Sequence, residues 1–212
     1  MEMYEEIKKI GIVPVVVLND AKDAEPLAEA LIEGGLNCAE VTFRTDAAEE
    51  SIKKITAKYP DMLVGAGTVL TIDQVNRAVK AGAKFIVAPG LNPEIVKYCQ
   101  NLGIPMIPGV QTPSEIEQGL ALGLNVLKFF PAEPSGGLKM IQAVAAAYVG
   151  VKFMPTGGIN PQNVRDYLAD EKHILCCGGS WMVKGDMIKA GEFEKIKELA
   201  KEAAAIVKEV RG

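Results

Sequence analysis

One lysine stands inside an apolar segment that is typical of a β-strand. Lys128 lies within Val126–Phe130, and the segment ends at Pro131. Burial disfavours the charged ammonium form, so such a lysine either extends its amine to water or gives up its proton and acts as a nucleophile. A strand-end lysine that reaches solvent is the commoner case for this local pattern, and other residues must decide between the two.

An acid and a base alternate along a second apolar segment. Because side chains of a strand point to opposite faces in turn, Glu40, Thr42 and Arg44 share one face and Val41 and Phe43 the other. The pair of opposite charges is either a buried ion pair without chemistry or a general acid/base beside an anion-binding group. If Lys128 joins them in a water-poor site, desolvation and the neighbouring guanidinium both favour its neutral amine.

Two glycine pairs near the end of the chain could bind an anion. They lie in Thr156-Gly-Gly-Ile159 and Cys177-Gly-Gly-Ser180. Without a Cβ, the backbone N–H groups of glycine can approach a phosphate closely, and the Ser180 hydroxyl adds a donor. A glycine pair alone is weak support, because turn glycines are common.

The elements that must position these residues alternate regularly between strands and helices. Helix starts are marked by the capping sequences Thr71-Ile-Asp-Gln74 and Thr112-Pro-Ser-Glu115 and by Asn92-Pro93 and Asn160-Pro161. The predicted strands cover about 11–18, 37–42, 62–66, 84–87, 105–107, 125–130, 152–154 and 174–177. Eight strand-helix units predict an α/β fold in which residues 1–212 form a single (β/α)8 TIM barrel with a short N-terminal helix. A doubly wound open sheet is the alternative, but Leu18-Asn19-Asp20 stands where its Gly-x-Gly-x-x-Gly turn is expected.

Composition narrows the class of function. The chain has a net charge of −4 and no basic block, which argues against a nucleic-acid partner. The N-terminus lacks an apolar signal core and no segment is long enough to cross a membrane, so we expect a cytoplasmic protein. The four cysteines fall at no metal-binding spacing and are expected to be reduced core residues. With His173 as the one histidine, we expect no metal site, and acid/base work falls to carboxylates, lysine or tyrosine.

In a barrel of this type the site lies at the carboxyl ends of the strands, and the loops after strands 7 and 8 commonly bind phosphate. That position favours a nucleophilic Lys128 beside Glu40 and Arg44, with phosphate on the two glycine pairs. His173 falls at the opposite end and is expected to be structural. Trp181 is expected to pack rather than to bind a ligand.

Seven motifs in order give the chain a resemblance to a known family. They are Glu40-Val-Thr-Phe-Arg-Thr45, Val64-Gly-Ala-Gly-Thr-Val-Leu70, Ala88-Pro-Gly90, Ile107-Pro-Gly109, Lys128-Phe-Phe-Pro-Ala-Glu133, Pro155-Thr-Gly-Gly-Ile159 and Gly178-Gly-Ser-Trp181. In them the chain resembles the 2-keto-3-deoxy-6-phosphogluconate (KDPG) and 4-hydroxy-2-oxoglutarate (KHG) aldolases. The resemblance implies a (β/α)8 fold, a homotrimer, no metal or other cofactor, and 2-keto acids and sugar phosphates as substrates.

The resemblance also implies a role for individual residues. Lys128 would form the Schiff base and Glu40 would be the general acid/base. Further roles would be carboxylate binding by Arg44 and Thr68, pocket walls at Pro89 and Phe130, keto-acid contact by Thr156, and phosphate binding by Gly157, Gly158, Gly179 and Ser180. One departure is the end of the first strand, where some members have arginine and this chain has Val17-Leu18. Phosphate binding is therefore expected to depend more on backbone donors.

The implied reaction is reversible cleavage of 2-dehydro-3-deoxy-6-phosphogluconate to pyruvate and glyceraldehyde 3-phosphate, and of 4-hydroxy-2-oxoglutarate to pyruvate and glyoxylate. Two other classes remain open from the residues. A phosphosugar epimerase or decarboxylase would use the same phosphate loops without a covalent lysine adduct, and a sugar-phosphate-binding regulator would need no nucleophile.

Overall fold

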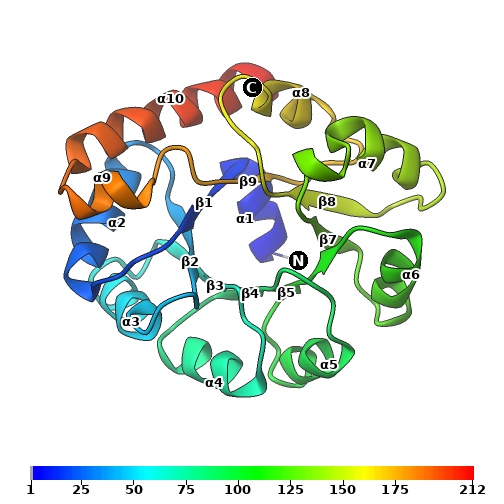
Figure 1. Ribbon diagram of the computed structural model, residues 1–212, viewed down its shortest axis with the longest axis horizontal. Helices are drawn as coiled ribbons and strands as arrows, with labels where there is room; N and C mark the ends of the chain where they lie inside the picture. Colours follow the sequence, from blue (N-terminus) through cyan, green and yellow to red (C-terminus); the bar gives the residue numbers. More distant parts are fainter. Residues whose placement is uncertain (1) are drawn as a thin grey trace.

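The computed structural model describes residues 2–212 as an α/β fold, in which parallel strands form a ring and helices surround it (Figure 1). The strands are β1 (Ile12–Val16), β2 (Cys38–Thr42), β3 (Leu63–Gly67), β4 (Phe85–Val87), β5 (Met106–Ile107), β6 (Gly109–Val110), β7 (Val126–Phe129), β8 (Lys152–Pro155) and β9 (Cys177–Gly179). The helices are α1 (Glu2–Ile10), α2 (Ala24–Glu33), α3 (Ala48–Lys58), α4 (Ile72–Lys80), α5 (Pro93–Asn101), α6 (Pro113–Ala121), α7 (Gly137–Ala145), α8 (Val164–Ala169), α9 (Gly185–Lys189) and α10 (Phe193–Arg211).

Two parallel sheets make up the ring. One has six strands in the order β5-β4-β3-β2-β1-β9, and the other has three in the order β6-β7-β8. The chain passes from the first sheet to the second at Pro108, between β5 and β6. On the other side, single parallel bridges pair Phe153 with Ile174 and Thr156 with Gly178. The sheets therefore curl toward each other, and the carboxyl ends of their strands lie at one end of the ring.

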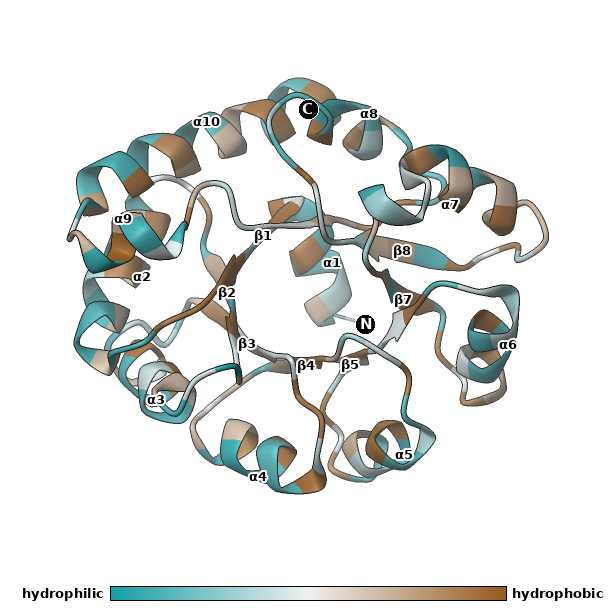
Figure 2. Ribbon diagram, viewed as in Figure 1, coloured by the Kyte–Doolittle hydropathy of each residue, from teal (hydrophilic) through white to brown (hydrophobic). Residues whose placement is uncertain are grey.

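Hydrophobic residues fill two layers. The outer layer lies between strands and helices, and Figure 2 shows α10 as a band of alternating hydrophobic and hydrophilic segments. In α10 the buried positions are Ile196, Ala200, Ala203, Ile206 and Val207, at the helical spacing expected from the sequence. The inner layer is a separate cluster of strand residues, including Val13, Phe85 and Val126, and it also contains Ile7 of α1. Helix α1 therefore closes the amino-terminal end of the ring (Figure 1).

The predicted helix starts are confirmed at three of four positions. Thr112 and Glu115 form the complete capping box of α6. The Thr71 hydroxyl accepts a hydrogen bond from the Gln74 N–H, and the Asn92 side chain accepts one from the Glu94 N–H. These bonds satisfy backbone donors that the first helical turn leaves without partners.

The prediction for Asn160-Pro161 is wrong in its position. The Asn160 side chain accepts a hydrogen bond from the Gln162 N–H at 2.9 Å and so holds a short turn, while the Asn163 side chain accepts one from the Asn160 N–H. Helix α8 begins only at Val164. A local side-chain bond replaces the first helical turn here.

Two strand boundaries also differ from the prediction. The strand expected at 105–107 is present as β5, but Pro108 separates it from a further short strand, β6, that was not predicted, because proline has no N–H for the ladder. The strand expected at 174–177 is displaced to Cys177–Gly179. The Arg211 guanidinium explains the second difference, since it donates to the Ile174 and Leu175 carbonyl oxygens at 3.1 and 2.7 Å and occupies acceptors that a strand would use.

Residues expected to be structural lie away from the carboxyl ends of the strands or in the core. His173 Nδ1 is 2.9 Å from Asp170 Oδ1, in the turn that precedes β9. The four cysteines are buried and unpaired within residues 2–212, and burial raises the pKa of the Cys99 thiol to about 11, so this thiol stays protonated and inert. Among the described helices, none combines the length and apolar character needed to cross a bilayer.

Candidate active site

Lys128 on β7 and Glu40 on β2 meet inside the ring. The Lys128 Nζ is 3.4 Å from Glu40 Oε1, although the two residues are 88 positions apart in the chain. Lys128 is 3% exposed and Glu40 is 0% exposed. The alternative of a lysine that extends to water is therefore wrong. The amine and the carboxylate are thus in contact with each other and shielded from water.

The space around Glu40 depends on a glycine of the next strand. A Cβ on Gly67 would lie 2.2 Å from Glu40 Oε1, closer than any real contact allows. Strand β3 pairs with β2 so that Gly67 is opposite Thr42 and Gly65 is opposite Glu40. Glu40 Oε2 is buried and has no hydrogen-bond partner within residues 2–212. One carboxylate oxygen thus contacts the lysine while the other is free for a substrate.

Thr42 of β2 and the two residues that follow the strand, Phe43 and Arg44, keep the predicted alternation. The Thr42 hydroxyl donates to the Val16 carbonyl oxygen at 2.9 Å and joins β2 to β1. Phe43 points to the helices, where the Arg77 guanidinium lies 5.5 Å from its ring centre. Arg44 Nε donates to the Thr68 hydroxyl at 3.2 Å. Thr68 has a φ of 53°, a left-handed conformation that is uncommon outside glycine and is often found at functional sites.

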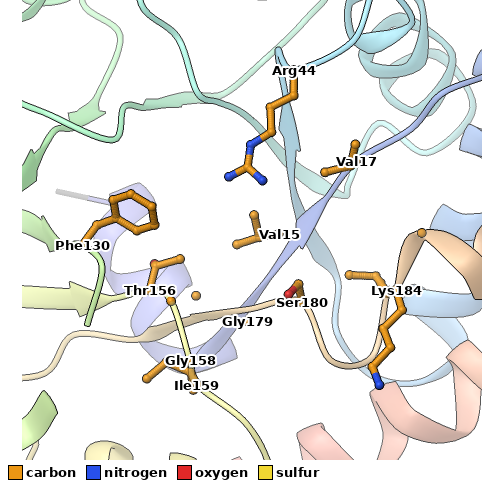
Figure 3. Close-up of a pocket in the computed structure, with 14 residues that line it drawn as sticks. Val15, Val17, Arg44, Phe130, Thr156, Gly158, Ile159, Gly179, Ser180 and Lys184 are labelled. Atoms are coloured by element: carbon orange, nitrogen blue, oxygen red, sulfur yellow. The ribbon is translucent and has the colours of Figure 1, made fainter. Parts of the chain in front are cut away.

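A cavity of about 490 Å³ opens at the carboxyl ends of the strands (Figure 3). Its lining includes seven predicted site residues, which are Arg44, Phe130, Thr156, Gly157, Gly158, Gly179 and Ser180. Figure 3 shows the Arg44 guanidinium and the Phe130 ring on one side and Ser180 and Gly179 on the other. Lys128 Nζ lies 5.3 Å from the Phe130 ring centre, which places the amine next to this cavity and allows a cation–π contact.

Steric constraints explain why glycine occupies several positions in the cavity lining. Gly157 and Gly158 have φ values of 101° and 85°, which side chains rarely tolerate. A Cβ on Gly179 would lie 2.0 Å from the Trp181 ring, so Trp181 packs against the loop as expected. The Ala132 and Glu133 N–H groups donate to the Thr156 and Gly157 carbonyl oxygens at 2.8 and 3.0 Å and fix the first loop.

One hydroxyl in the cavity wall lacks a partner. Thr156 is 6% exposed, and its Oγ1 has no hydrogen-bond partner among the described residues. A buried hydroxyl without a partner costs free energy, and at a cavity wall it is available to a ligand. Four of the predicted residues, Glu40, Thr68, Pro89 and Lys128, lie outside the cavity lining. Pro89 follows β4 and its carbonyl oxygen packs against Gly109, where a Cβ would be 2.0 Å away.

Several residues that line the cavity were missed from the sequence. Val15, Val17, Ile159, Val183 and Lys184 all contribute to it. Val17 was noted only as a departure, and Lys184 is exposed in a charged segment that resembles ordinary surface. Within residues 2–212, no three His, Cys, Asp or Glu residues are grouped to hold a metal ion.

Comparison with known proteins identifies the family to which this chain belongs. The family model of KDPG and KHG aldolases matches residues 3–199. The chain belongs to this aldolase family. The 2-dehydro-3-deoxy-phosphogluconate aldolase of Treponema pallidum is 47% identical over 205 residues, which is 97% of each chain.

Two solved structures of KDPG aldolases extend the match to the fold. The enzyme of Legionella pneumophila, with pyruvate captured as a covalent carbinolamine, is 40% identical with a TM-score of 0.91, covering 96% of this chain and 98% of that one. The enzyme of Zymomonas mobilis with 3-phosphoglycerate is 42% identical with a TM-score of 0.88, covering 96% and 95%. Among the three classes open from the sequence, these findings select the aldolase.

Proposed function

We propose that this chain is a class I aldolase that reversibly cleaves 2-dehydro-3-deoxy-6-phosphogluconate to pyruvate and glyceraldehyde 3-phosphate, and 4-hydroxy-2-oxoglutarate to pyruvate and glyoxylate. The observation that carries the proposal is the buried contact of 3.4 Å between Lys128 Nζ and Glu40 Oε1 beside an open cavity. Covalent capture of pyruvate in the Legionella pneumophila relative supports it.

The first half of the reaction uses Lys128. Its neutral amine adds to the C2 ketone to give a carbinolamine, and loss of water leaves a protonated imine. Glu40 then takes the proton of the C4 hydroxyl, and the C3–C4 bond breaks. The bonding electrons move to the imine nitrogen to form an enamine, and the aldehyde fragment leaves.

The second half regenerates both groups. Protonation of the enamine at C3, with Glu40 as the proton source, restores the imine, and water hydrolyses it to pyruvate and the free amine. Glu40 can serve in both steps because it gains a proton in the first and gives it up in the second.

The binding roles follow the charges of the cavity. Arg44 and Thr68 would hold the substrate carboxylate, since the guanidinium matches the planar shape of a carboxylate. Thr156 would donate to the keto acid, and Pro89 and Phe130 would wall the pocket. The N–H groups of Gly157, Gly158 and Gly179 and the Ser180 hydroxyl would hold phosphate.

The proposal extends to architecture. We infer that the described residues 2–212 form one closed (β/α)8 barrel. The two curled sheets and the bridges between Thr156 and Gly178 and between Phe153 and Ile174 support it. By family resemblance the assembly is a homotrimer, which light scattering of the purified protein checks.

Trapping of the imine tests the reaction. The protein is incubated with pyruvate and sodium borohydride, and peptide mass mapping locates the reduced adduct. We expect the adduct on Lys128 alone, because other lysines lack a buried setting. The Lys128→Gln variant should not label. Lys152→Gln is the matched control, since Lys152 is also a strand lysine, on β8 opposite Val126, and it should label normally. Labelling elsewhere, or none in the unmodified protein, overturns the Schiff-base assignment.

A further inference from the structure

At the proposed phosphate end of the cavity, no positively charged side chain is held in place. A phosphate ester carries nearly two negative charges at neutral pH. Of the residues that line the cavity, Arg44 and Lys184 are the two with a positive charge. Arg44 donates a hydrogen bond to the Thr68 hydroxyl and lies across the cavity from Ser180 in Figure 3. The glycine N–H groups and the Ser180 hydroxyl of the proposed phosphate site therefore have no fixed positive charge beside them.

The first strand cannot provide that charge. Val17 follows β1 and lines the same cavity, so the position beside Ser180 on this side is apolar. Figure 3 shows Val15 and Val17 between Arg44 and the Ser180 loop. The other cation of the cavity lining, Lys184, lies in the segment after Ser180.

Lys184 is the residue of that segment whose side chain can reach the proposed phosphate position beside Ser180. It follows Ser180 by four positions, and the turn between them is fixed by the Val183 N–H, which donates to the Ser180 carbonyl oxygen at 3.1 Å. Lys184 is exposed, and it has neither an ion pair nor a side-chain hydrogen bond within residues 2–212. In Figure 3 its stem begins beside Ser180 and its ammonium points away from the cavity.

No ion pair or side-chain hydrogen bond within residues 2–212 prevents the Lys184 side chain from changing its rotamer. The lysine stem has four flexible carbons, so rotation about its bonds can turn the ammonium toward the Ser180 hydroxyl without movement of the backbone. The nearby acid is Asp186, which lines a shallow depression with Lys184, and its Oδ1 already accepts the Met187 N–H at 3.0 Å.

We propose that Lys184 turns into the cavity when substrate binds and supplies the positive charge for its terminal phosphate. This proposal rests on the proposed function, and it makes Lys184 a specificity-determining residue for phosphorylated substrates. The shorter 4-hydroxy-2-oxoglutarate has no phosphate to contact it. The attraction acts at an exposed site, so it weakens as salt is added.

Steady-state kinetics on both substrates test the proposal. We expect Lys184→Gln to lower kcat/KM for 2-dehydro-3-deoxy-6-phosphogluconate roughly tenfold, the loss of one charge-assisted contact, and to leave 4-hydroxy-2-oxoglutarate unchanged. Lys184→Arg should retain most of the preference. The control is Lys189→Gln, which removes an exposed lysine of the neighbouring helix α9 and should change neither substrate. The preference of the unmodified protein should also fall with ionic strength more than that of Lys184→Gln.

The outcomes separate this proposal from the reaction itself. Equal losses on both substrates, or no loss on the phosphorylated one, overturn the role of Lys184 while pyruvate still labels Lys128 under borohydride. Absence of that labelling in the unmodified protein overturns the aldolase mechanism instead.

Discussion

Thr156 offers a test in which stability and activity should change in opposite directions. Its hydroxyl is buried without a partner, and its backbone is held independently by the Thr156 N–H, which donates to the Phe129 carbonyl oxygen at 3.0 Å. Thr156→Val keeps the branched shape and replaces the hydroxyl with a methyl group. The substitution should therefore remove a desolvation cost without disturbing the loop.

The magnitudes follow from the hydroxyl. A buried polar group without a partner costs about 1–3 kcal/mol, and we expect the variant to recover about 1 kcal/mol of it. For a domain of this size that raises Tm by about 2–4 °C. If the hydroxyl donates to the keto acid, its loss costs about 1.5–3 kcal/mol of binding, or roughly ten- to a hundredfold in kcat/KM.

Calorimetry and a coupled assay for pyruvate release measure the two effects. Ser51→Ala is the matched control, because the Ser51 hydroxyl on α3 is also buried and has no hydrogen-bond partner within residues 2–212, but it lies outside the cavity. That variant should be as stable as the unmodified protein or more so, with unchanged kinetics. A lower Tm for Thr156→Val, or full activity, would refute the reasoning that the Thr156 hydroxyl is unpaired in the free protein and binds the substrate.

Three further predictions concern charged groups. Glu40→Gln should still form the imine but lose roughly two to four orders of magnitude in cleavage rate, which comparison of borohydride labelling with turnover will show. Arg44→Lys keeps the charge but loses the planar fork, so KM for both substrates should rise, as initial rates will show. Burial would raise the pKa of Asp170, but hydrogen bonds from His173 and Gln142 lower it overall. Its stabilising effect is thus present above the ordinary pKa of about 4 and is lost as pH falls through the lowered pKa. The Asp170→Asn variant should therefore have a lower Tm near neutral pH, and its Tm should fall less on acidification. Measurement of Tm against pH will show both effects.

Much of the site could be predicted because strands alternate and parallel strands end at one edge. The alternation alone put Glu40 and Arg44 on one face and Phe43 on the other, as the structure has them. The distance in sequence between Glu40 and Lys128 is large, and only the prediction of a closed set of strands brought them together.

The rest depended on contacts that a sequence pattern does not contain. The displaced strand near Ile174 follows from Arg211, which comes from the far end of the chain. The place of Lys184 at the cavity follows from a turn and a five-residue helix, α9, that carry no strong periodic signal. Sequence also could not show that Thr156 lacks a hydrogen-bond partner, because satisfaction of a polar group is a property of the folded surroundings.

Helix α1 determines the route by which substrates and products enter and leave the ring. It seals one end of the ring with Ile7 inside the inner cluster, so molecules enter and leave past the glycine loops at the other end. In the cleavage proposed above, the phosphorylated fragment would occupy that exit while pyruvate is still bonded to Lys128 deeper in the ring. The aldehyde must depart first and pyruvate last. In the condensing direction the same blind end requires pyruvate to enter first, so an aldehyde that arrives early obstructs the passage and inhibits in competition with pyruvate.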